Sequence, residues 1–103
     1  MVRYRSTLEV RYGHFAEHLE IMEELAKVVK ARGLHAPTYL VPTVGRTNQF
    51  IIEIDFPDLA TFEAENRKFY GDAEIMKLIR RSAELVVQGS TYDELFEPAP
   101  HLA

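Results

Sequence analysis

The spacing of hydrophobic residues changes abruptly near the start of the chain, and this change limits the folds available to it. Residues 2–12 alternate between an apolar or hydroxyl-bearing face and a charged face, which predicts a strand with one buried side. After Gly13 the apolar residues recur every three or four positions up to Val29, which predicts an amphipathic helix of about 18 residues that stops at Gly33. Such a strand followed by such a helix calls for a helical layer packed on a sheet.

Two further strands are predicted after this helix. Residues 38–44 form an extended stretch, and Pro37 and Pro42 lack the N–H group that a central strand needs, so we expect an edge strand or a bulged one. Residues 49–56 alternate between apolar and polar side chains and predict a third strand. The turn-forming residues 45–48 between these stretches favour a hairpin.

A second helix and a last strand complete the predicted order. Asp58 is placed to cap a helix that Gly71 and Asp72 interrupt, and Asp72 can cap its continuation. Residues 86–92, or a little beyond, predict the final strand. The order β-α-β-β-α-β predicts an α+β, ferredoxin-like fold, in which helices cover one face of a four-stranded antiparallel sheet.

The uncovered face of this sheet is a candidate dimer surface. We expect it to carry Arg3, Arg5, Thr7, Glu9 and Arg11 together with Ile51, Tyr39 and Val41. Pairing of the arginines with Glu9, Glu53 and Asp55 on neighbouring strands is favoured over an anionic ligand on the arginine row. A half-apolar face on a small domain predicts a homodimer.

Length and composition exclude several classes of protein. A chain of 103 residues allows one domain, which we place at residues 1–97, with a C-terminal tail at residues 98–103 that is disordered or draped over a partner. Without cysteine there is no disulfide framework, thiolate zinc site or cysteine nucleophile. A net charge of -4 disfavours nucleic acid as a partner. No apolar run is long enough for a membrane span or a signal peptide, so we expect a soluble, cytoplasmic protein.

Three stretches in the second half of the chain stand out together. They are a strand with a proline turn at Phe50–Ala60, a break at Gly71–Glu74 and a closing segment at Tyr92–Pro98. In this combination the chain resembles the C-terminal half of NIPSNAP domains, in the dimeric α+β barrel superfamily. The resemblance implies a dimeric α+β barrel, and it leaves the function open because the superfamily also includes cofactor-free monooxygenases, lactone isomerases, polyketide cyclases, stress-responsive barrel proteins and haem-degrading enzymes.

The run from His14 to His18 matches the H-x-x-E-H pattern of inverted zincins, with both imidazoles on one side of the first helix. A chain of this size has no facing helix pair to supply the third ligand, so we predict no functional zinc and no cofactor. A haem or metal bound through His14, His18 or His35 remains an alternative.

A small set of polar residues is predicted on faces that should be apolar. His18 continues the inward stripe of the first helix, and its imidazole is suited to proton transfer, which makes it the candidate catalytic residue. Asn66 is expected on the inner face of the second helix, above Tyr4 and Tyr92 on the sheet. A polar-lined cavity between helices and sheet would explain these four residues together.

Besides a haem or metal binder, these patterns leave three functions open. The leading one is a small-molecule-binding barrel protein of NIPSNAP-like type with no assigned reaction. The second is a cofactor-free monooxygenase, or an isomerase or cyclase, that acts on an aromatic or polyketide-like substrate. The third is an interaction module without a ligand, which requires a filled space between helices and sheet. Whether the protein is an enzyme is not decided by the sequence.

Overall fold

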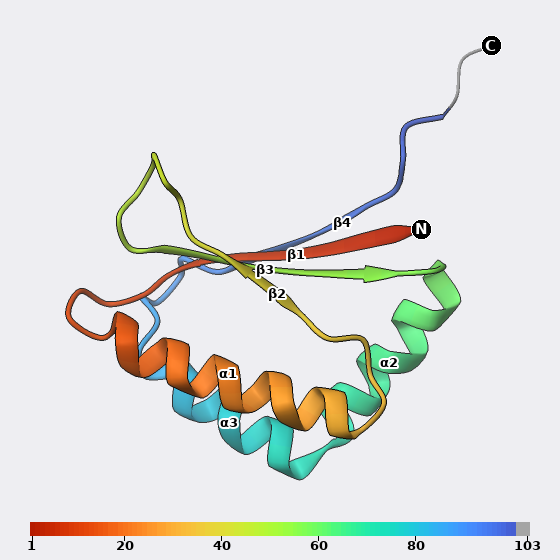
Figure 1. Cartoon of the computed structure of the whole chain (residues 1–103), viewed down its shortest axis with the longest axis horizontal. Helices are drawn as coiled ribbons and strands as arrows, with labels where there is room; N and C mark the ends of the chain where they lie inside the picture. The colour runs from red at the N-terminus through yellow and green to blue at the C-terminus, as the bar shows by residue number, and fades with distance from the viewer. Residues whose placement is uncertain (101–103) are drawn as a thin grey trace.

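The computed structural model describes residues 1–100, which contain four strands and three helices. In chain order these are β1 (Val2–Glu9), α1 (Phe15–Ala31), β2 (Thr38–Leu40), β3 (Gln49–Phe56), α2 (Leu59–Gly71), α3 (Ala73–Ala83) and β4 (Tyr92–Phe96). The strands form one antiparallel sheet in the order β2-β3-β1-β4, and the helices lie on one side of it (Figure 1). The predicted ferredoxin-like α+β fold is confirmed.

The register of the sheet decides which side chains face the helices. β1 and β3 pair along their whole lengths, with Val2 opposite Phe56. β4 pairs with the edge of β1 that β3 leaves free, and there Ser6 lies opposite Asp93. Because side chains alternate along a strand, the even-numbered residues of β1 and β3 form the inner face and the odd-numbered ones form the outer face.

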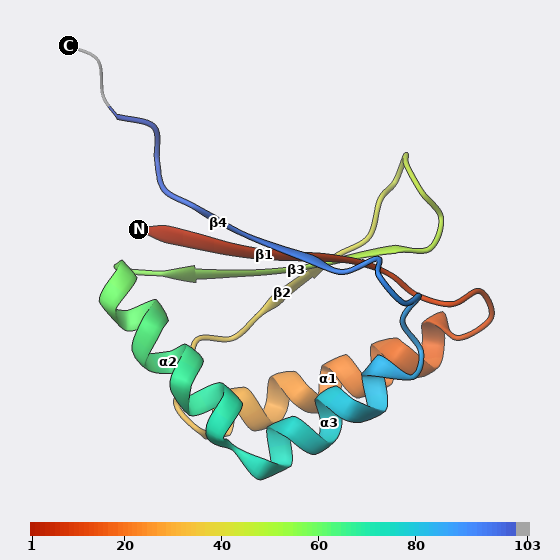
Figure 2. The ribbon, with the colours of Figure 1, turned by 180° about the vertical axis from the view of Figure 1, so that it is seen from behind.

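The hydrophobic core lies between the sheet and the pair α1 and α3. These two helices lie side by side beneath the sheet, whereas α2 slopes from the end of β3 towards the start of α3 (Figures 1 and 2). The core consists of Leu8, Val10, Ile21, Met22, Leu25, Val29, Phe50, Ile75, Leu78 and Leu85. α2 contributes no buried residue to it.

The two predicted helix caps are confirmed. The Asp58 carboxylate accepts a hydrogen bond from the Thr61 N–H at 2.7 Å, at the start of α2. The Asp72 carboxylate accepts hydrogen bonds from the Glu74 and Ile75 N–H groups at 2.9 and 3.0 Å, at the start of α3. The interruption between the two helices therefore lies where the sequence placed it, because Asp72 is extended and stabilises a new helix start.

The last strand begins later than predicted. β4 covers Tyr92–Phe96, whereas the alternation pointed to residues 86–92, of which Val86 makes only an isolated bridge. Gly89 has a φ of 80°, and the Ser90 hydroxyl donates a hydrogen bond of 2.6 Å to the backbone three residues earlier. This turn ends the extended run, so strand pairing restarts only after it.

β1 and β2 are shorter than the sequence patterns indicate, whereas β3 covers the predicted residues 49–56. β1 ends at Glu9, and Tyr12 beyond it is 77% exposed. β2 has three residues and stops before Pro42, which has no N–H group for the ladder. Tyr39 faces the helices and not the outer face, because its hydroxyl donates a hydrogen bond of 2.5 Å to the carbonyl oxygen of Met22 on α1.

The outer face carries the predicted cross-strand ion pairs of Arg3 and Arg5, but among the described residues none of Arg11, which lies beyond the end of β1. Arg3 pairs with Asp55 at 2.8 Å and Arg5 with Glu53 at 2.7 Å. Glu9, however, pairs with Arg46 of the β2–β3 loop and not with a β1 arginine. Within residues 1–100, no helix combines the length and the hydropathy that crossing a membrane demands. The cytoplasmic location and the division at residue 97 stay predictions, and residues 101–103 of the proposed tail lie outside the described part of the chain.

Candidate functional site

A cavity of about 510 Å³ lies between the helices and the inner face of the sheet. Its floor is made by side chains from all four strands: Tyr4, Ser6, Leu8, Tyr39, Ile52, Ile54, Phe56 and Asp93. Its walls are made by His18, Met22, Leu25 and Val29 of α1, Phe62, Asn66, Phe69 and Tyr70 of α2, and Ile79, Ser82 and Ala83 of α3. Pockets that hold small molecules have volumes of roughly 300 to 1,000 Å³.

His18 is the most deeply buried polar side chain of this cavity. Helix α1 turns it inward, and 1% of its surface is exposed. The edge of its ring meets the Phe50 ring, with 4.8 Å between the centroids. Neither Nδ1 nor Nε2 has a hydrogen-bond partner among the described residues. The inward orientation predicted from the helical stripe is therefore confirmed, and the ring has an unused donor and an unused acceptor.

Burial sets the charge of this imidazole. It lowers the pKa of His18 below the ordinary value of 6.5, because the cation would lose its hydration, and no charged neighbour adds to this effect. The ring is therefore uncharged near neutral pH. A neutral imidazole can accept a proton or a hydrogen bond at one nitrogen and donate from the other.

A second polar group lies on the floor, at the β4 edge. The Ser6 hydroxyl donates a hydrogen bond of 2.6 Å to the carboxylate of Asp93, its partner across the strands. Tyr4 lies on the same face of β1 and stacks on Phe62 of α2, with 6.0 Å between the ring centroids. Burial and, to a smaller extent, the Asp93 carboxylate raise the pKa of the Tyr4 phenol, so it stays protonated and can donate.

Asn66 lines the cavity from α2, but not in the buried position that the sequence suggested. Helix α2 has no buried residue, and Asn66 is exposed. The helix stands away from the sheet, so water reaches the amide and the cost of burying it does not arise. The structure brings Asn66, His18 and Tyr4 to one cavity, although only His18 is buried there.

Tyr92 is the predicted site residue that the structure places elsewhere. It is 55% exposed and pairs with Thr7 on the outer face, whereas the next residue, Asp93, lines the cavity. The later start of β4 explains the exchange, because a shift of one residue moves a side chain to the opposite face. The segment Tyr92–Phe96 has no regular alternation of polar and apolar residues, so the sequence carried no signal for its inner face.

One end of the cavity is bordered by a histidine–carboxylate contact that the sequence did not reveal. The Glu65 carboxylate of α2 accepts a hydrogen bond of 2.7 Å from the His35 N–H and lies 2.5 Å from Nδ1 of the His35 ring. The His35 ring also contacts Phe56, with 5.4 Å between the centroids. This contact joins α2 to the segment before β2, residues 30 positions apart in the chain.

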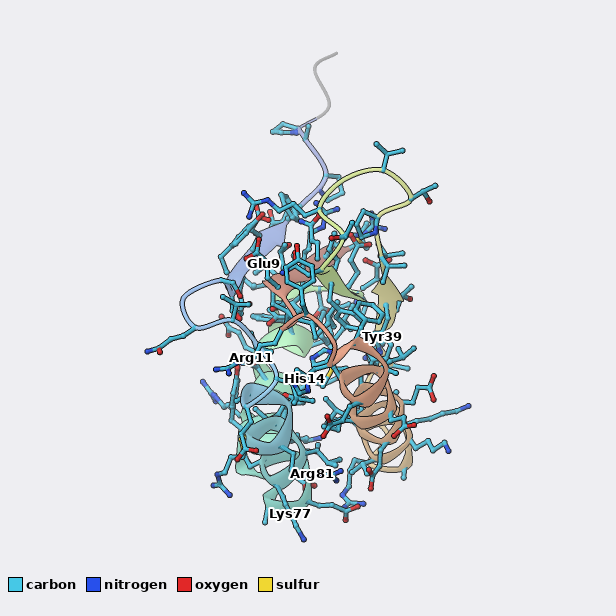
Figure 3. All side chains as sticks on the ribbon, turned by 90° about the vertical axis from the view of Figure 1, so that its left-hand side faces the viewer. Glu9, Arg11, His14, Tyr39, Lys77 and Arg81 are labelled. Atoms are coloured by element: carbon cyan, nitrogen blue, oxygen red, sulfur yellow. The ribbon has the colours of Figure 1, made fainter. Side chains whose placement is uncertain are left out.

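The H-x-x-E-H run does not form a paired histidine site. His14 precedes α1, and its side chain is 48% exposed with Nδ1 3.4 Å from Glu17, while His18 is buried in the cavity wall. Figure 3 shows His14 and Arg11 at the end where β1 leaves the sheet, above the two helices. Within residues 1–100 no group of three or more histidine or carboxylate side chains is arranged to hold a metal ion, and the absence of functional zinc stays a prediction.

Comparisons with known proteins give a match in structure but not in sequence. No protein-family model matches the chain, and no curated protein matches its sequence. A NIPSNAP family protein from Agrobacterium tumefaciens is similar with a TM-score of 0.79 at 20% identity, over 95% of this chain and 92% of that one. A NIPSNAP domain protein from Burkholderia xenovorans gives 0.80 at 13% identity, over 100% and 99%.

The same fold occurs in an enzyme structure. A variant of SnoaB, a cofactor-independent oxygenase from Streptomyces nogalater, is similar with a TM-score of 0.72 at 14% identity, over 98% of this chain and 95% of that one. The resemblance to NIPSNAP domains stated from the sequence is thereby confirmed at the level of the fold. The chain has the ferredoxin-like α+β fold that these NIPSNAP and oxygenase structures share.

Proposed function

We propose that the protein is a small-molecule-binding α+β barrel protein of NIPSNAP-like type, with the ligand held between the helices and the sheet. The observation that carries this proposal is the cavity of about 510 Å³ with the buried, unpartnered His18 in its wall. Protein interiors are packed densely and leave few voids larger than a water molecule. A space of this size is therefore more typical of a binding site than of a packed core. The same space argues against an interaction module without a ligand.

The chemistry of the lining supports a mostly apolar ligand. Leucine, isoleucine, valine, phenylalanine and methionine side chains from both layers make most of the surface, and a few polar groups are set among them. This is the usual composition of a small-molecule site, in which apolar contact provides affinity and the polar groups provide orientation.

Binding of an uncharged fluorescent dye tests this proposal. N-phenyl-1-naphthylamine emits strongly in apolar surroundings, and we expect one saturable site per chain. Asn66→Trp adds bulk at the cavity wall and should weaken dye binding at least several-fold. The matched control is Arg67→Trp, since Arg67 is exposed on the same helix and does not line the cavity. Absence of saturable binding, or equal loss in both variants, would contradict the proposal.

A catalytic role is the second candidate, and the neutral His18 favours it. A buried imidazole without a partner can accept a proton from a bound carbon acid, as a cofactor-free monooxygenase, isomerase or cyclase requires. The oxygenase SnoaB shares the fold. Oxygen uptake, and exchange of ligand C–H protons for deuterium followed by NMR, test this role. We expect either signal to be lost in His18→Gln and kept in His14→Gln.

We further propose that the outer face of the sheet pairs two copies of the chain. One row of side chains crosses all four strands on this face and consists of Leu40, Ile51, Thr7 and Tyr92. At its two ends Leu40 is 41% exposed and Tyr92 is 55% exposed. Phe96 is also 38% exposed, and the centroid of its ring lies 5.0 Å from the guanidinium carbon of Arg5. Residues 97–100 rise away from this face, towards the side on which a second copy would lie (Figure 1). An apolar row that crosses a whole sheet is typical of an interface between copies.

A further inference from the structure

We propose that the cavity selects an uncharged, mostly apolar molecule that carries a hydroxyl group, and that this hydroxyl pairs with the His18 ring. The inference deepens the proposed binding function and rests on it. It names the class of ligand from the groups that the cavity leaves unsatisfied.

The His18 ring is the point at which a ligand gains most. Its two nitrogens are the buried side-chain polar atoms without a partner in the described part of the chain, although 1% of the residue is exposed. The hydroxyls of Ser6, Tyr39 and Ser82 also line the cavity, and they already have partners in Asp93, the Met22 carbonyl oxygen and the Ile79 carbonyl oxygen. The side chains of Asn66 and Tyr70 are exposed, so water can serve their polar groups. A buried polar atom that lacks a partner carries a desolvation cost, which a ligand group can remove.

The ligand group at His18 must be uncharged. Met22 and Leu25 follow His18 on the buried side of α1, and Phe50 packs against its ring. Burial alone accounts for its lowered pKa, so no charged side chain acts on the ring strongly enough to add to it. A carboxylate or ammonium placed there would lose its hydration without a counter-charge.

The other ionisable side chains of the cavity lie away from His18, and they do not favour an anion on the floor. Asp93 holds its carboxylate beside Ser6, and His35 is already paired with Glu65 at the other end. Among the described residues that line the cavity, Arg11 is the one arginine or lysine, and it is exposed at the end where β1 leaves the sheet (Figure 3). A ligand carboxylate could therefore find a positive partner only at this exposed end.

A hydroxyl suits a neutral imidazole better than a carbonyl. The ring carries one N–H donor and one bare acceptor nitrogen, and either nitrogen can hold the proton. A hydroxyl can donate to the bare nitrogen or accept from the N–H, so it can pair with either nitrogen. Each nitrogen has less than 1 Å² of accessible surface in this structure, so the pairing requires a small rotation of the ring towards the cavity. A carbonyl can serve only the donor. Hydroxyl ligands thus gain a hydrogen bond in either tautomer.

A series of three compounds with one ring system tests the inference. Naphthalene, 2-naphthol and 2-naphthoate compete with N-phenyl-1-naphthylamine near neutral pH, where 2-naphthol is uncharged and 2-naphthoate is an anion. We expect 2-naphthol to bind most tightly. The preference for 2-naphthol over naphthalene should fall about 3- to 10-fold in His18→Leu, the range expected for one hydrogen bond.

Two further variants make the result specific. His18→Gln keeps a donor and an acceptor and should retain part of the hydroxyl preference, so it also serves if His18→Leu does not fold. His14→Leu changes an exposed histidine of the same run and should leave the preference unchanged.

The outcomes separate the inference from the proposed function. If naphthalene and the dye bind but 2-naphthol has no advantage, or keeps it fully in His18→Leu, the hydroxyl inference is wrong and the binding function stands. If 2-naphthoate binds most tightly and loses its affinity in Arg11→Gln, the site takes anions and the inference is overturned. If none of the compounds binds, the proposed function itself fails, and the inference fails with it.

Discussion

His18 shows how one helical position can serve the core and a site together. The ring is packed like a core residue, with its edge against Phe50, yet both nitrogens are without partners among the described residues. An apolar residue of similar size would avoid the cost of desolvating them, which for one such group is on the order of 1 to 3 kcal/mol. A residue that reduces stability in this way is often retained for binding or catalysis.

The pH dependence of stability follows from this burial. Because the folded-state pKa of His18 is lowered below 6.5, the unfolded chain binds a proton at pH values at which the folded chain does not. The contribution of His18 is complete above pH 6.5 and is lost as the pH falls from there through the folded-state pKa. In that window the free energy of unfolding should fall by up to about 1.4 kcal/mol per pH unit from this residue.

Urea unfolding at a series of pH values measures this slope. We expect His18→Leu to be more stable than the unchanged protein and to lack the part of the slope that His18 contributes. His14→Leu is the matched control, since it replaces an exposed histidine of the same run with the same residue. A slope in His18→Leu as steep as in the unchanged protein would refute the assignment.

At the scale of elements, α2 and α3 have similar caps and different roles. α3 buries Ile75 and Leu78 in the core, whereas α2 has no buried residue and forms a cavity wall. α2 is joined to its surroundings through rings, Phe62 against Tyr4 and Phe56, and through the Glu65–His35 contact. A helix held in this way can adjust to a ligand at little cost to the core.

The two caps should therefore differ in their effect on stability. Asp72 accepts two N–H groups of α3 and pairs with Arg32 of the α1 end at 2.8 Å, so Asp72→Ala should lower the midpoint of thermal unfolding by about 4 to 8 °C. Asp58→Ala should have a smaller effect, because fraying of α2 exposes no core residue. Asp72→Asn keeps the cap and loses only the charge, so its midpoint of thermal unfolding should lie between those of Asp72→Ala and the unchanged protein. Equal losses at Asp58 and Asp72 would mean that α2 supports the core after all.

At the scale of the whole molecule, the single chain is more open than a compact domain of its length. It exposes 7041 Å² where a folded monomer of this mass exposes about 6,000 Å². Its radius of gyration is 14.5 Å, against about 13 Å for a compact chain of this length. The cavity and the β2–β3 loop, in which Val44 is 94% exposed, contribute to this surface. An additional surface of this size is enough to contribute to an interface between two copies, which requires roughly 1,000 Å² in total.

Light scattering tests the proposed pairing of two chains. We expect a particle of twice the chain mass of 11.9 kDa at micromolar concentration. Ile51→Arg places a charge in the apolar row of the outer face and should shift the protein to the single-chain mass. Val44→Arg is the matched control, since Val44 is 94% exposed in the β2–β3 loop. A single-chain mass for the unchanged protein would contradict the proposal, and so would a dimer that tolerates Ile51→Arg.

The sequence by itself determined the features that depend on local periodicity and local hydrogen bonding. The change from a period of two to a helical period predicted β1 and α1, and the position of His18 in the helical stripe predicted that it points inward. Asp58 and Asp72 were recognisable as caps because a cap bonds to N–H groups two or three residues away. These interactions lie within one element, so one stretch of residues contains the whole signal.

Only the tertiary structure decided which of these residues share a site. The distance at which α2 stands from the sheet leaves Asn66 exposed, and no local pattern records that distance. The start of β4 placed Asp93 in the cavity instead of Tyr92, because register depends on the partner strand. The His35–Glu65 contact joins elements that are far apart in the chain. A cavity is a property of the gap between layers, and the amphipathic patterns of each layer specify its faces but not the space that packing leaves between them.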